Sequence, residues 1–158
     1  MHSISMSHAI ADEILNWRYE PPYDIYNNEK SEEAFKEFLG GSYQGVINDE
    51  STIIGFFCAG KAAQVPKGHE YHVYPDGYID IGLGMKPALT GKGRGSEFLA
   101  FILEQTTLES GNKPFRLTVA SFNERAIHLY GKFGFRQQQK FANGHIEFLT
   151  MVKETEKA

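Results

Sequence analysis

Apolar residues recur at helical spacing in four segments of the chain. In the first, Ile10, Ile14 and Trp17 stand at positions i, i+4 and i+7, which places them on one face of a helix. Such a face packs against a core while the polar positions between its members meet water. Helices are therefore predicted over residues 7–17 and 31–39, between Gly95 and Gly111, and between Asn123 and Gly134.

Residues at the ends of these segments strengthen the helix predictions. Three helices follow a residue whose side chain accepts hydrogen bonds from the exposed N–H groups of a first turn. These capping residues are Ser7, Ser31 and Asn123. Glycine adopts the left-handed conformation that ends many helices at little cost, and the predicted stops are Gly40, Gly111 and Gly134.

Short segments rich in β-branched and aromatic residues predict strands. They are 43–47, 52–58, 78–85, 115–119, 135–142 and 145–152, with an irregular polar stretch at 64–75. Asn48-Asp49 and Asn143-Gly144 each separate two of these strands, which predicts two hairpins. Strand–helix–strand order in the middle of the chain requires a parallel pair. We therefore expect an α/β (α+β) fold with a mixed central sheet flanked by about four helices.

The length of 158 residues is typical of one domain. No internal repeat or Pro/Gly/Ser linker divides the chain, so residues 1–152 are assigned to a single domain and residues 153–158 to a short polar tail. Cys58 is the only cysteine, which excludes an intramolecular disulfide and fits a reducing, cytoplasmic location.

Charge and hydropathy exclude several classes of partner. The net charge is -4, which argues against nucleic acid as a bulk partner and leaves only a local basic patch open. The longest apolar run, residues 53–60, is far shorter than the ~20 residues that cross a bilayer, and the first ten residues carry no secretory signal. His69 and His72 lack the spacing of a helical zinc site, so no metal is expected.

Glycine is concentrated before the third predicted helix. Six of the sixteen glycines lie within residues 77–95, and three alternate with two cations in the run Gly91-Lys92-Gly93-Arg94-Gly95-Ser96. A helix start presents unpaired N–H groups and the positive end of the helix dipole. The absence of side chains lets a phosphate approach these amides, so the run predicts a phosphate-binding loop.

Two other phosphate loops fit this run less well. The P-loop needs Ser or Thr directly after its lysine, but Gly93 follows Lys92, and Lys86 stands where the first glycine belongs. The dinucleotide fingerprint G-x-G-x-x-G does not fit the run either, and it normally opens the first strand–helix unit of a chain.

A third pattern matches. Tyr78-Ile79-Asp80-Ile81-Gly82-Leu83-Gly84-Met85-Lys86-Pro87, followed by Thr90-Gly91-Lys92-Gly93-Arg94-Gly95, resembles motif A of the GNAT acetyltransferases. Gly93 and Gly95 occupy its two small positions, and Thr90 replaces the usual Gln or Arg. Residues 117–135 resemble motif B: a strand, an Asn-capped helix, a Tyr and a Gly-Phe ending. Both motifs stand in the family's order, and the predicted elements match the family fold over nearly the whole chain.

The resemblance implies that acetyl-CoA is the cosubstrate and that no metal takes part. Its diphosphate would bind Gly91, Lys92, Gly93, Arg94, Gly95 and Ser96. Backbone groups of Leu83 and Met85 would contact the pantetheine arm, with the Met85 N–H polarising the thioester oxygen. Asn123 would contact the arm as well as capping its helix. Gly82 and Gly84 fit a bulge or a close backbone approach. The alternative for the glycine loop is a tight strand–helix connection, and the alternative for Leu83 and Met85 is ordinary core packing.

The resemblance also implies the catalytic residues. Tyr130 would protonate the departing thiolate, since a phenol and a thiol have similar pKa values; the alternative is a core aromatic residue. Asp80 would accept the proton of the amine or bind its ammonium group, unless it is simply a polar residue on the sheet. Trp17, Tyr23 and Tyr26 would hold the amine by cation–π contact, or pack an irregular loop.

The activity predicted from these residues is acetyl-CoA-dependent N-acetylation of a primary amine on a small molecule or a peptide end. Transfer would be direct, in a ternary complex, because Cys58 in an apolar strand is a poor nucleophile. Two alternatives stay open, a non-catalytic acyl-CoA sensor and a nucleotide-binding module. The acceptor and the oligomeric state, a homodimer included, are not fixed by the sequence.

Overall fold

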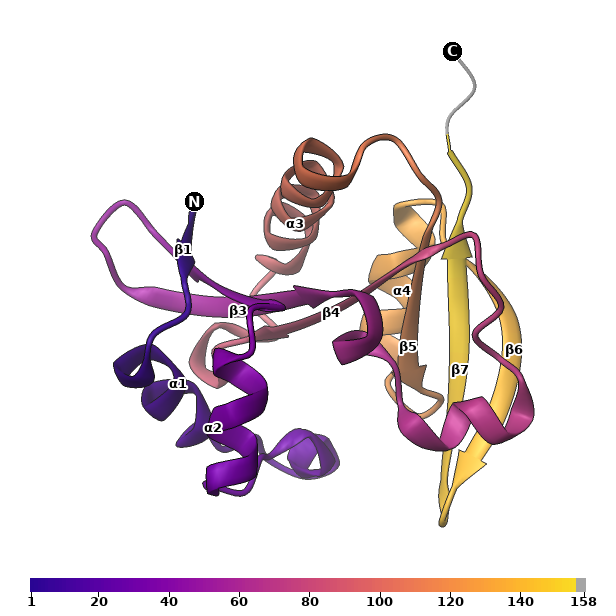
Figure 1. The fold of residues 1–158 in the computed structure, drawn as a ribbon, viewed down its shortest axis with the longest axis horizontal. Helices are drawn as coiled ribbons and strands as arrows, with labels where there is room; N and C mark the ends of the chain where they lie inside the picture. The colour runs from indigo at the N-terminus through magenta and orange to yellow at the C-terminus, as the bar shows by residue number, and fades with distance from the viewer. Residues whose placement is uncertain (156–158) are drawn as a thin grey trace. The chain divides into compact units, whose positions relative to one another are not determined.

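The computed structural model describes residues 1–155, whose contacts divide them into two compact units. The first unit contains Met1–Cys58 and Leu83–Ile102. The second contains Ala59–Gly82 and the described residues from Leu103 onward. Strand β4 (Ile79–Met85) and helix α3 (Gly95–Ser110) each contribute residues to both units (Figure 1).

Within the described residues, the strands are hydrogen-bonded in the order β1-β2-β3-β4-β5-β7-β6. Besides β4 they are β1 (His2–Ser5), β2 (Tyr43–Ile47), β3 (Ile53–Ala59), β5 (Phe115–Ala120), β6 (Arg136–Asn143) and β7 (Ile146–Lys153). The ladder between β4 and β5 is parallel, whereas those of β1–β2, β2–β3, β5–β7 and β6–β7 are antiparallel. The predicted mixed sheet is confirmed.

In the first unit, helices α1 (His8–Leu15) and α2 (Glu32–Leu39) pack together on one face of the strands (Figure 1). Their predicted caps are confirmed, because Ser7 Oγ accepts from the Ile10 N–H and Ser31 Oγ accepts from the Ala34 N–H, both at 3.2 Å. A core of Ala11, Ile14, Leu15 and Phe38 lies beneath them. A second cluster joins Val46, Ile54 and Phe57 to Phe98 and Ile102 of α3.

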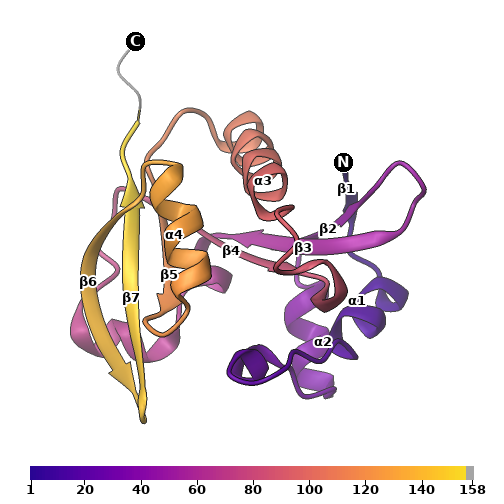
Figure 2. The same cartoon turned by 180° about the vertical axis from the view of Figure 1, so that it is seen from behind.

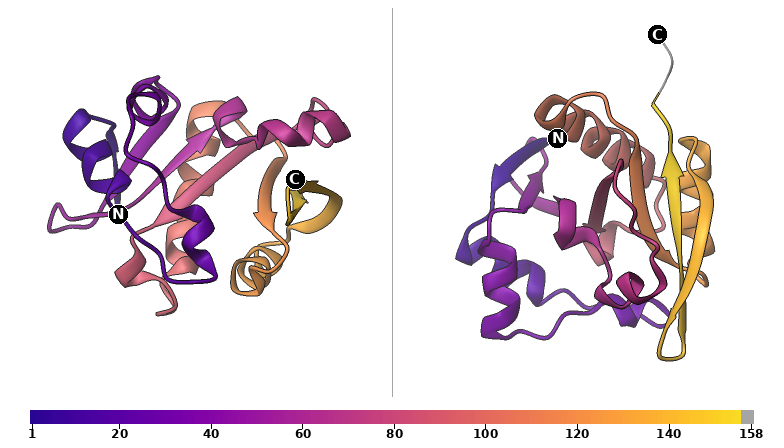
Figure 3. Two further views of the ribbon diagram at one scale, coloured as in Figure 1. Left: turned by 90° about the horizontal axis from the view of Figure 1, so that it is seen from below. Right: turned by 45° about the vertical axis from the view of Figure 1, so that its right-hand side comes forward.

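In the second unit, helix α4 (Glu124–Lys132) lies across β5 and β7 (Figure 2). Its apolar side chains pack on a core formed by Ile81, Phe115, Leu117, Val119, Phe135, Leu149 and Met151. Two 3₁₀ helices, η2 (Gly60–Ala63) and η3 (Pro66–Tyr71), precede β4. Figure 3 shows η3 beside the β6–β7 hairpin, where the Tyr71 and Phe141 rings are 6.1 Å apart. The stretch 64–75, for which the sequence left an inserted loop and a frayed strand as alternatives, is thus partly 3₁₀ helix.

Strand β1 is not predicted from the sequence, because His2–Ser5 has neither an apolar run nor a turn signal before it. Its four residues pair antiparallel with β2, from His2 opposite Ile47 to Ser5 opposite Gln44. Such a strand is defined by its partner more than by its own residues, so periodicity does not reveal it.

Three predicted boundaries are wrong in detail. Gly40 has a φ of -76°, and Gly41 (φ 99°) takes the left-handed position instead. Asn143 pairs with Ile146, so the two-residue hairpin turn is Gly144-His145, with the positive φ at Gly144 that a Gly-X turn requires. Lys153 ends β7 opposite Phe115 and does not begin the tail, of which residues 156–158 lie outside the described residues.

Candidate functional site

The predicted phosphate loop is an exposed connection that leads into α3. Residues 91–94 are exposed, and Gly91 and Gly93 have φ angles of 73° and 76°. The Phe98 N–H donates to the Arg94 carbonyl at 3.2 Å, as the first intrahelical bond of α3. The amides of residues 95–97 therefore precede the helical ladder and are available for an anion.

The backbone conformation of this loop by itself explains why Gly91 and Gly93 are glycines. A Cβ atom at Gly93 would meet nothing within 4 Å, so the left-handed backbone and not crowding by the protein disfavours other residues there. The same open space leaves room for a ligand over the backbone. Thr90 Oγ1 donates to the Pro87 carbonyl at 2.7 Å, so the hydroxyl that stands where the family has Gln or Arg binds the short 3₁₀ helix η4 (Pro87–Leu89).

The carboxyl end of β4 is closely packed in the first unit. The side chains of Leu83 and Met85 pack against the core cluster that contains Phe98. A Cβ at Gly84 would collide with the Phe56 ring, and one at Gly55 would lie 2.7 Å from the Gly84 carbonyl oxygen. The Phe56 ring therefore gives Gly84 a packing reason, and the bulge or close approach predicted for Gly82 and Gly84 beside a cofactor stays a prediction. The cofactor contacts of Leu83 and Met85 stay predictions.

Asp80 forms a buried ion pair in the second unit. Arg116 on β5 donates to both of its oxygens, from Nε to Oδ1 at 2.7 Å and from Nη2 to Oδ2 at 2.8 Å. Arg116 is 1% exposed and Asp80 3% exposed. The pair is aligned because Asp80 stands opposite Arg116 in the parallel ladder.

Further polar groups complete this cluster. Gln64 Nε2 donates to Asp80 Oδ2 at 2.8 Å, and the His69 ring is 2.8 Å from Gln64 Oε1. Arg116 also donates to the Pro75 carbonyl, and its guanidinium lies 5.1 Å and 5.3 Å from the centres of the Tyr74 and Tyr78 rings. The cluster therefore anchors the segment before β4 to the sheet.

These contacts argue against Asp80 as a proton acceptor. A general base must reach the substrate with a free oxygen lone pair, yet both Asp80 oxygens already accept charge-assisted or amide hydrogen bonds in a buried position. The base role stays a prediction that the geometry does not favour. Sequence reasoning missed Arg116; the available signal was one charged residue in each of two otherwise apolar strands.

Asn123 and Tyr130 stand at the two ends of α4. Asn123 Oδ1 accepts from the Ala126 N–H at 3.2 Å, which confirms the cap. Tyr130 is half-buried, packs against the core of the second unit, and has its ring 6.0 Å from that of Phe135. The ring thus contributes to packing. The roles of both side chains toward a cofactor stay predictions.

The aromatic segment after α1 belongs to the first unit. Trp17 packs against Phe56 with ring centres 6.2 Å apart, and its buried Nε1 has no hydrogen-bond partner among residues 1–155. Tyr23 and Tyr26 begin and end the 3₁₀ helix η1 (Tyr23–Tyr26). Tyr19 was not among the predicted acceptor residues, and its hydroxyl donates to the Met85 carbonyl at 2.6 Å. This bond joins the predicted acceptor segment to the end of β4.

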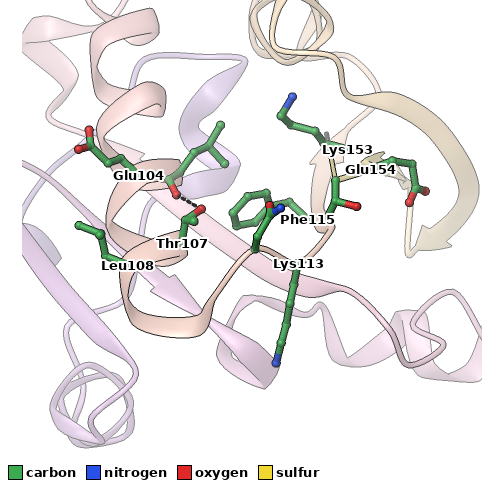
Figure 4. Close-up of a pocket in the computed structure, with 10 residues that line it drawn as sticks. Glu104, Thr107, Leu108, Lys113, Phe115, Lys153 and Glu154 are labelled. Atoms are coloured by element: carbon green, nitrogen blue, oxygen red, sulfur yellow. Dashed lines mark hydrogen bonds between the residues drawn. The ribbon is translucent and has the colours of Figure 1, made fainter. Parts of the chain in front are cut away.

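A pocket of about 490 Å³ lies in the second unit, at the end of α3 and beside the last residues of β7 (Figure 4). Charged side chains of Glu104, Lys113, Lys153 and Glu154 line it, and none of the predicted site residues does. The described residues hold no group of three or more His, Cys, Asp or Glu side chains placed to bind a metal. Among residues 1–155, no helix is long and apolar enough to cross a membrane.

Comparison with known proteins decides the family. The model of the acetyltransferase (GNAT) family matches residues 11–135. The chain belongs to this family. GNAT membership confirms the family and the class of activity that the motifs predicted, an acetyl-CoA-dependent N-acetyltransferase. The matched residues include the glycine loop and the segment that ends in Gly134-Phe135.

Solved structures confirm the GNAT fold. The aminoglycoside acetyltransferase AAC(6')-Ib, in complex with ribostamycin and coenzyme A, has a TM-score of 0.74 at 14% identity, covering 96% of this chain and 92% of that chain. A GNAT acetyltransferase from Bacillus anthracis has a TM-score of 0.71 at 16% identity, covering 96% and 93%. A spermidine N-acetyltransferase chimera of SpeG from Vibrio cholerae and hSSAT has a TM-score of 0.68 at 17% identity, covering 98% of this chain and 96% of that chain. A search of curated proteins gave no match.

Proposed function

We propose that this GNAT protein transfers the acetyl group of acetyl-CoA directly to a primary amine on a small molecule or a peptide end. The observation that carries the proposal is the glycine loop at the start of α3, within the residues that the family matches. In the reaction the amine nitrogen forms a bond to the acetyl carbon, and the carbon–sulfur bond breaks. The thiolate gains a proton and the amine nitrogen loses one.

The diphosphate of acetyl-CoA is assigned to the loop at residues 91–96. The amides of the first turn of α3 precede the intrahelical hydrogen bonds and would donate to the diphosphate, and the helix dipole would add a favourable field. Lys92 and Arg94 are exposed beside these amides, so that both cations reach a diphosphate without losing an existing buried contact. Ser96 adds a hydroxyl donor.

The roles at the acetyl end are assigned residue by residue, as the resemblance to the GNAT family implies. The backbone of Leu83 and Met85 would contact the pantetheine arm, with the Met85 N–H as the donor to the thioester oxygen, where negative charge develops during attack. Asn123 would add a contact to the arm. Tyr130 would donate its hydroxyl proton to the departing thiolate, which a phenol is suited to do because its ordinary pKa is near 10 and that of a thiol near 8.5.

The amine is assigned to the aromatic segment of Trp17, Tyr23 and Tyr26, whose ring faces attract a cation. The buried partners of Asp80 leave proton removal to water as the simplest route. The structural neighbours include proteins named as an aminoglycoside acetyltransferase and a spermidine N-acetyltransferase, which supports an amine acceptor without choosing one. We also propose a cytoplasmic location, which suits the lone, buried thiol of Cys58, and a homodimer, which size-exclusion chromatography tests.

The test combines binding with turnover. Acetyl-CoA is expected to raise the melting temperature, and ATP and NAD are not. Thiol release from acetyl-CoA is then measured against a panel of polyamines, aminoglycosides, amino acids and peptides. Stabilisation without thiol release from any amine would favour the acyl-CoA sensor, and stabilisation by ATP or NAD alone would favour the nucleotide-binding module.

Removal of both loop cations is expected to weaken acetyl-CoA binding. The Lys92→Ala/Arg94→Ala variant should raise the Kd for acetyl-CoA about tenfold at low salt, because two exposed charge contacts of modest strength are lost. The difference should shrink at high salt, where exposed charges are screened. Titration calorimetry at two salt concentrations measures both effects.

The Lys36→Ala/Lys140→Ala variant is the matched control. Both lysines are exposed, and their loss changes the net charge by the same amount. A Kd that rises equally in the two variants would show a general effect of charge and not a contact at the loop.

A further inference from the structure

The loop between α1 and η1 is tied to the core of the first unit through Tyr19. The Tyr19 N–H donates to Asn27 Oδ1 at 2.7 Å, which fixes the backbone of the loop at this residue. The Tyr19 hydroxyl donates to the Met85 carbonyl at 2.6 Å, across 66 residues of sequence. Tyr19 is half-buried, so this short hydrogen bond is partly shielded from competing water.

The Met85 carbonyl points to the edge of β4 that faces away from β3. The N–H of the next residue, Lys86, donates to the Ile54 carbonyl of β3 at 2.8 Å. Backbone groups alternate in direction along a strand, and the N–H and C=O of one residue point to the same edge. Both backbone groups of Met85 therefore point away from β3, to the edge where Tyr19 binds the carbonyl.

The residue before Met85 is Gly84, and glycine has the most flexible backbone of all residue types. Gly84 has no Cβ to restrict its torsion angles, and it is glycine because the Phe56 ring fills the place of a Cβ. The peptide plane that carries the Met85 N–H is therefore held by its neighbours and not by the local backbone. The Tyr19 hydrogen bond holds the following peptide plane, which carries the Met85 carbonyl, and so it restricts the Met85 torsion angles that connect the two planes.

We propose that Tyr19 is a positioning residue that orients the backbone N–H of Met85 toward the thioester oxygen. The inference rests on the proposed function, which gives that N–H its catalytic role. Tyr19 does not touch the reacting atoms in this proposal. It holds the peptide donor in the direction that the oxyanion requires, so that no reorganisation is needed during attack.

The protonation state of Tyr19 suits this role. Burial raises the pKa of the Tyr19 hydroxyl to about 12. The hydroxyl therefore keeps its proton, and donates to Met85, over the whole range in which the enzyme would be assayed.

The test removes only the hydroxyl. The Tyr19→Phe variant should lower kcat about fivefold, the size of one neutral hydrogen bond, and leave the KM for acetyl-CoA within about twofold, because the diphosphate loop is untouched. Tyr43→Phe is the matched control: it removes a phenol hydroxyl from the same unit, where Tyr43 donates to Glu37, and should leave kcat unchanged. Melting curves check that both variants fold.

A spectroscopic measurement reports on Met85 without turnover. The chain has four methionines, so selective ¹⁵N-methionine labelling gives a simple amide spectrum, in which Met85→Leu identifies the Met85 signal. Tyr19→Phe should shift or broaden that signal and leave Met151 unchanged, and Tyr43→Phe should not affect it.

An unmoved Met85 signal in Tyr19→Phe, or a moved signal with unchanged kcat, would overturn the proposal. A fall in kcat/KM that comes entirely from KM would overturn it too, because a positioned oxyanion donor acts in the transition state. Wild-type protein that releases no thiol would instead refute the proposed function, and the methionine signal alone would then decide whether Tyr19 orders the end of β4.

Discussion

Replacement of Tyr130 by phenylalanine is expected to lower kcat about 100-fold while the Kd for acetyl-CoA stays within about twofold. General acids contribute about 10²–10⁴-fold, and the low end applies because a thiolate is already a fair leaving group. The substitution keeps the ring that packs on the core of the second unit, so the melting temperature should be nearly unchanged. Thiol-release kinetics and calorimetry with acetyl-CoA separate the two quantities.

Tyr78→Phe is the control for Tyr130→Phe. Tyr78 donates its hydroxyl to the exposed Glu154 at 2.9 Å, and its ring is retained beside Arg116. The control should therefore keep wild-type kcat. If Tyr130→Phe keeps it as well, Tyr130 is a packing residue and the proton reaches the thiolate from elsewhere. If the Kd rises and kcat does not fall, the hydroxyl binds the cofactor and does not act as an acid.

Asp80→Asn is expected to lower the free energy of unfolding by about 3 kcal/mol. Removing one charge of a buried, hydrogen-bonded pair leaves the other uncompensated, which typically costs about 3–5 kcal/mol. Arg116 would keep its contact to the Pro75 carbonyl but lose its counter-ion in a site that is almost fully buried. In a chain of this size the melting temperature should fall by about 6–12 °C. Urea denaturation and calorimetry measure both.

The same variant separates the structural role of Asp80 from the base role. If Asp80 is a structural residue, the Asp80→Asn variant should keep most of its kcat at temperatures well below its lowered melting point. If Asp80 is the base, the variant should lose activity at every temperature at which it is folded, and the acidic limb of its pH profile should disappear. Asp76→Asn changes an exposed carboxylate four residues earlier and should stay within about 0.5 kcal/mol of wild type.

Local signals in the sequence predicted most of the elements. Ser7, Ser31 and Asn123 were recognised as caps because a cap binds an N–H within three residues of itself. The parallel pair of β4 and β5 followed from the order strand–helix–strand, and the β6–β7 hairpin from a two-residue turn signal, although the turn lies one residue later than predicted. Strand β1 carries no such signal, because its four residues are recognised as a strand by their register with β2.

In the candidate site, too, features that are local in the sequence were predicted and contacts between distant residues were not. The glycine loop was visible because alternating glycines and cations before a helix form a contiguous pattern, and its left-handed residues Gly91 and Gly93 fit that pattern. The charged residue in each of the two strands was visible, but the pairing of Asp80 with Arg116 was not, since the two lie 36 residues apart and meet only through the strand register. Tyr19 was missed for the same reason.

Apart from β1 and the 3₁₀ helices, the sequence by itself indicated the family and the order of the elements, and it predicted the glycine loop before α3, because each depends on contacts or motifs within a few turns of the chain. Only the tertiary structure decided that Asp80 serves as the counter-ion of Arg116 and that Tyr19 binds the end of β4. Those contacts join residues that are far apart along the chain. Their geometry depends on how strands and loops pack, which no local pattern of residues encodes.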